Sequence, residues 1–203
     1  MTTTTATVTS APRRSILRSN ATQMILAFTG LIILCVVFSL ASPIFFTFSN
    51  ISSILLATAV NGILALGVTF IIITGGIDLS VGTVMTLSAV MTGVFITNWG
   101  LPVPIGVLAG LGTGALAGLI NGVTIAKMKI PPFIATLGTM MIARGLALVI
   151  SDVAPIYFND TPSFGKIAMG SIVGLFAPEF SIPNAVLILF GAAIVGSIIL
   201  SKT

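Results

Sequence analysis

Six apolar runs, each about as long as a membrane is thick, constrain this chain more than any other feature. A hydrocarbon core about 30 Å thick is spanned by roughly 20 residues of α-helix. Eight basic and four acidic residues in a chain of 203 are too few to coat a water-soluble surface. We therefore expect an all-α, polytopic membrane bundle with six transmembrane helices. The runs cover residues 23–42, 50–74, 79–98, 104–126, 132–151 and 184–201.

The segments between the runs contain helix-breaking residues, and they define the expected organisation. Glycine or proline stands at each short break, as in Gly75-Gly76. We expect a tail over residues 1–22, followed by one transmembrane domain over residues 23–203. Residues 152–183 are more polar than the runs, and we expect them to form an outer loop with a short interfacial helix near residues 163–174.

Lysine and arginine lie mostly on one side of the expected bundle, and this bias predicts its orientation. Cytoplasmic loops of membrane proteins are enriched in these two residues. If the N-terminus is cytoplasmic, only Lys166 faces outward, and Arg144 lies within a span. The expected cytoplasmic set is Arg13, Arg14, Arg18, Lys127, Lys129 and Lys202.

The first run has a second interpretation, as a signal peptide that is cleaved. Three arginines precede it, and Ser39 and Ala41 fit the small-residue rule for cleavage. The apolar stretch from Met24 to Leu40 is longer than a usual signal core, which favours a retained span. Cleavage would leave five spans and would reverse the predicted orientation.

Several classes of site are excluded by composition. The chain has no histidine, so it has no histidine metal ligands, Ser-His dyads or Cys-His pairs. Its single cysteine, Cys35, lies within the first run and has no partner for an intrachain disulfide. The net charge of +4 comes without a basic stripe interleaved with aromatics, so nucleic acid is not an expected partner. We expect no metal and no cofactor in this chain.

Asp78 is the only charged residue between Arg18 and Lys127, and it lies in the stretch IIITGGIDLSVG. One interpretation is local: Gly75-Gly76 ends a helix, and Asp78 caps the next one, with Ser80 completing the turn. The other interpretation places Asp78 in the working part of the molecule. A phosphate loop is excluded, because neither Gly-Lys-Ser/Thr nor GxGxxG spacing is present.

We single out three more polar side chains within the apolar runs. Asn61 and Asn121 each precede a glycine, and each is expected to hydrogen-bond across helices or to line a substrate path. Arg144 is costly at membrane depth, so we expect it to reach toward Asp152 or to line a polar cavity. If the helices run straight to the surface, Arg144 lies roughly 20 Å from Asp78, whereas a break at membrane depth would let the two approach.

The fourth run carries glycine at a strict spacing of four. Such a row forms a groove without side chains along one helix face, which lets a neighbouring helix approach closely. We therefore expect this helix to be central in the bundle. The row consists of Gly106, Gly110, Gly114, Gly118 and Gly122.

Two long motifs, in this order, resemble a known family. They are NGILALGVTFIIITGGIDLSVGTVMTLSAV and GLINGVTIAKMKIPPFIATLGTMMIARGLALV. Both are similar to the permease subunits of bacterial ABC importers for monosaccharides, of the ribose, xylose, galactose and autoinducer-2 type. The resemblance extends from about Ser42 to the last residue.

The resemblance implies a permease of the bacterial inner membrane that pairs with a second permease copy or a close paralogue. It further implies a periplasmic sugar-binding protein outside and a cytoplasmic ATPase subunit inside, so the permease itself is not an enzyme. The motif positions that carry over, without individual roles, are Gly75, Gly76, Asp78, Ser80, Gly82, Phe133, Thr136, Leu137, Arg144 and Gly145. The hypothetical substrate pathway or conformational motif consists of Asn61, Gly75, Gly76, Asp78, Ser80, Gly82, Thr136 and Arg144.

The sequence also departs from the family pattern. Family permeases have about ten spans, and the cytoplasmic segment that docks on the ATPase follows the sixth. This chain reaches LSKT where that segment begins, so we expect it to be the N-terminal part of a permease or a truncated product. Two other classes stay open: a secondary transporter or channel for a small polar solute, and an intramembrane enzyme. The first would be expected to carry more membrane acids than Asp78, and the second to carry paired catalytic groups.

Overall fold

The computed structural model describes residues 20–176 and 182–202, and every regular element in them is helical. The expected all-α class is therefore confirmed. Six helices are long and apolar enough to cross a membrane: Thr22–Ala41, Phe48–Ile73, Val81–Asn98, Val103–Ala126, Pro132–Ile150 and Asn184–Lys202. They coincide closely with the six apolar runs, because the length and the hydropathy of a span are both local properties of the sequence.

The chain divides into two compact units, Met1–Ile51 and Ser52–Thr203. In the first unit, helix α1 spans Asn20–Ala41, and most of its described side chains are exposed. The Phe38 and Phe45 rings stack at its end, with centroids 6.1 Å apart. The Asn50 side chain donates to the Phe45 carbonyl at 2.8 Å, which ties the turn after α1 to the start of the next helix.

The second unit contains most of helix α2 (Phe48–Ile73) and all later elements. Helix α3 (Val81–Gly93) continues into a π-helical turn, η2 (Val94–Asn98). Helices α4 (Val103–Ala126) and α5 (Pro132–Ile150) each have proline in the first turn, where its missing N–H costs nothing.

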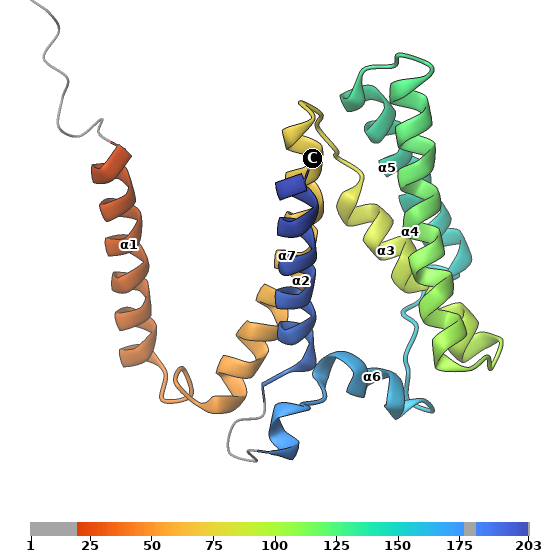
Figure 1. Cartoon of the computed structure of the whole chain (residues 1–203). Coiled ribbons are helices and arrows are strands. Elements are labelled where there is room, and N and C mark those ends of the chain that lie inside the picture. Colours follow the sequence, from red (N-terminus) through yellow and green to blue (C-terminus); the bar gives the residue numbers. More distant parts are fainter. Residues whose placement is uncertain (1–19, 177–181, 203) are drawn as a thin grey trace, which may run out of the picture. The chain divides into compact units, whose positions relative to one another are not determined.

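The core of this unit forms where α3 packs against both α4 and α5 (Figure 1). Its buried side chains are Leu87 of α3 with Ala143 and Ala147 of α5. The two alanines of α5 let the backbones of α3 and α5 approach closely, as is usual between membrane helices. Helix α2 contacts the last helix, since a side chain at Gly62 would meet Leu189, 2.8 Å away.

The connection between α5 and the last helix contains two short helical elements. Helix α6 spans Pro162–Met169, and a 3-10 turn, η3, spans Val173–Leu175. Helix α7 (Asn184–Lys202) follows, and the Asn184 side chain accepts a hydrogen bond from the Ile172 N–H at 2.8 Å. The expected loop over 152–183 also includes residues 177–181, and the expected tail over 1–22 includes residues 1–19; both stretches lie outside the described residues.

Candidate functional site

A sharp helix end at Gly75 creates the break between α2 and α3. Gly75 has φ +75°, a left-handed conformation that residues with a Cβ rarely adopt. Its N–H donates to the Ile72 carbonyl at 2.9 Å, and the Gly76 N–H donates to the Ile71 carbonyl at 3.0 Å. This pair of bonds is the Schellman arrangement that ends many helices. The two glycines therefore end α2 as the sequence indicated, and the chain turns toward α3.

Asp78 folds onto Ser80 at the start of α3. Its Oδ1 atom accepts hydrogen bonds from the Ser80 N–H at 2.7 Å and from the Ser80 hydroxyl at 2.6 Å. Ser80 is 1% exposed, and its carbonyl accepts the Val84 N–H, the first bond of the helix. Asp78 thus holds the residue that begins α3, and the exposed amides further into the helix are not its partners.

The hydroxyl of Thr136 fixes the same loop from the first turns of α5. It accepts a hydrogen bond from the Leu79 N–H at 3.2 Å and donates to the Ile77 carbonyl at 3.3 Å. The Phe133 carbonyl of its own helix, at 3.4 Å, shares the same proton. Thr136 is 2% exposed. One side chain therefore satisfies a backbone donor and a backbone acceptor in a segment that has no helix to pair them.

Asn121 of α4 extends these contacts to a third helix. Its amide donates to the Ser80 hydroxyl oxygen at 3.2 Å, and its carbonyl oxygen accepts the Thr139 hydroxyl. The bonds run in one direction, from Thr139 through Asn121 and Ser80 to the carboxylate of Asp78. We call Asp78, Ser80, Asn121, Thr136 and Thr139 the Asp78 network. Among the described residues, no buried side-chain nitrogen or oxygen lacks a hydrogen-bond partner.

The network lies below the ends of the helices that hold it. Asn121 is five residues before the end of α4 at Ala126, and Thr136 is four residues after the start of α5 at Pro132. At 1.5 Å per residue, these spacings place the network about 6–8 Å inside the helix ends. The α2–α3 junction is therefore recessed into the bundle.

Two of the expected site residues lie away from the network. Asn61 is exposed on α2, ten residues before Ile71, or about 15 Å along the helix. Arg144 is exposed on α5 and follows Ala143, which is buried against α3. It lies about 140° around α5 from Thr139, so the recessed junction does not bring Arg144 onto the network face. Gly82 is exposed in the first turn of α3.

The glycine row of α4 divides into two parts. A Cβ at Gly106 would lie 3.1 Å from the Thr92 carbonyl oxygen, and one at Gly110 would lie 3.0 Å from that of Ser88. These glycines are where α3 and α4 touch. At Gly118 and Gly122 a Cβ would meet nothing within 4 Å in the described chain, so the two helices separate toward the Asp78 network.

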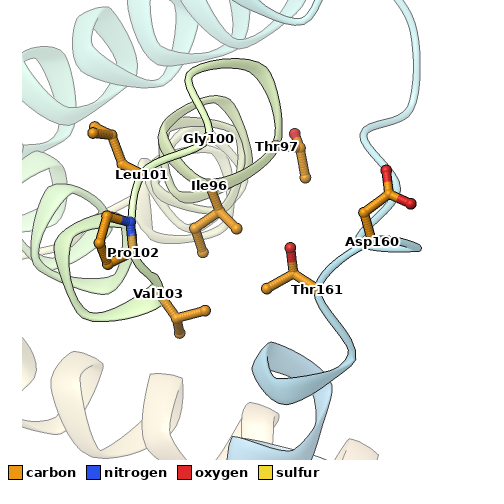
Figure 2. A pocket seen from close by; sticks show the side chains of 8 residues that line it. All are labelled: Ile96, Thr97, Gly100, Leu101, Pro102, Val103, Asp160 and Thr161. Carbon is orange, nitrogen blue, oxygen red and sulfur yellow. The ribbon is translucent and has the colours of Figure 1, made fainter.

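A hollow of about 390 Å³ lies at the opposite end of the α3–α4 pair. Figure 2 shows Thr97 and Ile96 on one side of it, and Asp160 and Thr161 on the segment before α6 on the other. The hydroxyl of Thr97 donates to the Gly93 carbonyl at 2.7 Å. This hollow is separate from the Asp78 network.

Sequence reasoning placed Asp78, Ser80 and Thr136 in one motif, and the structure brings these three together. Sequence reasoning did not place Asn121 in that motif, and it did not single out Thr139. Only the positions of these two residues in the sequence could have indicated that they belong to the network. Thr139 lies one helical turn after Thr136. Asn121 and Thr139 lie at similar distances on either side of the short α4–α5 connection.

The fold is that of a multi-pass helical membrane protein. The profile of the family described as "Branched-chain amino acid transport system / permease component" matches residues 50–203. The chain belongs to this family.

Several curated relatives are sugar import permeases, which confirms the resemblance seen in the motifs. The chain is 39% identical over 155 residues to the ribose import permease protein RbsC of Haemophilus influenzae, covering 75% of this chain and 48% of that protein. It is 40% identical over 164 residues to RbsC of Bacillus subtilis (80% and 51%). It is 39% identical over 168 residues to the L-arabinose transport system permease protein AraH of Escherichia coli (83% and 49%). The chain thus spans about half the length of the curated relatives it matches. No solved structure matches it.

Proposed function

We propose that this chain forms part of the permease subunit of an ATP-driven importer and provides the membrane path for a monosaccharide. The observation that carries the proposal is the likeness to the ribose and L-arabinose permeases over 75% to 83% of the chain. The subunit is not catalytic: a cytoplasmic partner hydrolyses ATP, and a periplasmic binding protein delivers the sugar. A second permease copy or a close paralogue completes the path.

The charge distribution supports a cytoplasmic N-terminus in the inner membrane. With six spans, the side that holds the N-terminal tail also holds the α2–α3 and α4–α5 connections. Lys127 and Lys129 stand in the second of these connections, as the positive-inside rule expects. The Asp78 network is then near the cytoplasmic end of the bundle, and α6 is on the periplasmic side.

The test is sugar uptake by the permease reconstituted in proteoliposomes with its ATPase and binding protein. We expect radiolabelled ribose to accumulate only when ATP, the ATPase and the binding protein are all present. ATP-independent uptake by the permease alone would overturn the proposal and favour a secondary transporter or channel. Replacing the ATP by a non-hydrolysable analogue is the matched control.

A further inference from the structure

Two hollows meet at Asp78, between α2, α3 and α4. One has a volume of about 310 Å³ and reaches along α3 to Ser88. The other, of about 470 Å³, lies beside the end of α2 at Ile71 and the start of α5 at Pro132 and Thr136. Both are lined by Asp78, Gly118 and Asn121. Their volumes fall in the range of cavities that bind small molecules, about 300–1,000 Å³.

The polar groups of these hollows suit a solute that carries several hydroxyl groups. Both hydrogen bonds that Asp78 accepts end on Oδ1, so Oδ2 has no donor in the described part of the chain. The Ser80 hydroxyl and the Asn121 amide are bonded to each other, and they hold the carboxylate in place. A positioned carboxylate oxygen is a strong acceptor for O–H donors.

The charge of the lining limits the solute further. In the described chain no lysine or arginine lines either hollow, and Asp78 is the only ionisable group there. A phosphorylated or carboxylated solute would meet a like charge without a counter-charge, which is unfavourable in a site of low dielectric constant. A neutral polyol meets no such penalty.

We propose that the joined hollow is a transit subsite for a neutral polyhydroxylated solute, which bonds to Oδ2 of Asp78 and slides past Gly118 and Gly122. This inference rests on the proposed function. The two glycines leave open the space that the solute needs, since a Cβ at either position would meet nothing within 4 Å.

The first experiment measures water access at position 118. In a Cys35→Ser background, which removes the one thiol of this sequence, Gly118→Cys is compared with Gly112→Cys in reconstituted membranes. Gly112 also has open space around it, but it lies about 120° around α4 and lines neither hollow. A water-soluble methanethiosulfonate reagent is expected to label the thiol at position 118 at least tenfold faster. Equal rates, or no labelling at position 118, would overturn the proposal.

The second experiment measures ribose uptake by the assembled importer at saturating binding protein. Gly118→Leu is expected to reduce the maximal uptake rate at least tenfold, and Gly112→Leu to leave it within twofold of wild type. Asp78→Asn retains an Oδ1 acceptor for both Ser80 donors but removes the charge, and it is expected to lower the maximal rate about tenfold. If Asp78 acts only through the turn, this variant transports like wild type and the proposal fails.

The two proposals fail in different ways. A wild-type assembly that moves no sugar with ATP would contradict the proposed function, whatever the labelling at position 118. A wild-type assembly that moves sugar while Gly118→Leu matches Gly112→Leu would contradict the subsite alone. Membrane abundance of each variant, measured by blotting, separates loss of transport from loss of folded protein.

Discussion

Thr136 offers the sharpest test of the recessed junction, because one hydroxyl serves two backbone groups. Thr136→Val keeps the shape of the side chain but removes the partner of the Leu79 N–H and of the Ile77 carbonyl. An unsatisfied buried backbone group costs about 1–3 kcal/mol. Both bonds are only partly buried, so we expect a loss in the lower part of this range, about 1–2 kcal/mol.

The assay is equilibrium unfolding of the purified protein in mixed micelles. Thr136→Ser retains the hydroxyl and is expected to recover at least half of the lost free energy of unfolding. Thr113→Val is the matched control, since that hydroxyl bonds only to the Ala109 carbonyl of its own helix at 2.8 Å. We expect this control to stay within about 0.5 kcal/mol of wild type, as helix back-bonds contribute little. The reasoning is refuted if Thr136→Val is as stable as Thr113→Val, or if Thr136→Ser is as unstable as Thr136→Val.

Three further variants test other parts of the second unit. Gly75→Ala is expected to lose about 1–2 kcal/mol of stability in the same assay, because of its positive φ, while Gly82→Ala loses none. Gly110→Leu is expected to abolish folded protein, as judged by size-exclusion chromatography, whereas Gly112→Leu folds; folded Gly110→Leu would contradict the α3–α4 packing. Asp78→Ala is expected to lower uptake more than membrane abundance, and equal losses would make Asp78 a folding residue.

The spans and the glycine turn were predictable because each depends on a short stretch of sequence. Length and hydropathy define six helices, and Gly75-Gly76 defines the end of α2 without reference to any other helix. Hydrogen bonds between spans depend instead on the depth and rotation of one helix against another. Nothing local in the sequence sets the register that brings Asn121 to Ser80 and Thr139, so that part of the network needed the structure.

The glycine row of α4 shows the same limit of prediction from sequence, since the contacts between helices are not set by a local pattern. A spacing of four predicts a continuous groove along α4, but α3 follows only part of it closely. The two helices touch at Gly110, whereas at Gly118 a Cβ would meet nothing within 4 Å. A regular sequence pattern therefore served two purposes in one helix, close packing at one end and an open surface at the other.

The recessed position of Asp78 also sets how strongly it senses the membrane voltage. Along α4, Asn121 lies about 27 Å from the Val103 end and about 8 Å from the Ala126 end. A charge at this depth crosses only about a fifth of the field, worth roughly 0.5 kcal/mol per 100 mV, against about 2.3 kcal/mol for a full crossing. The passage of a neutral solute past Asp78 should therefore depend only weakly on membrane potential.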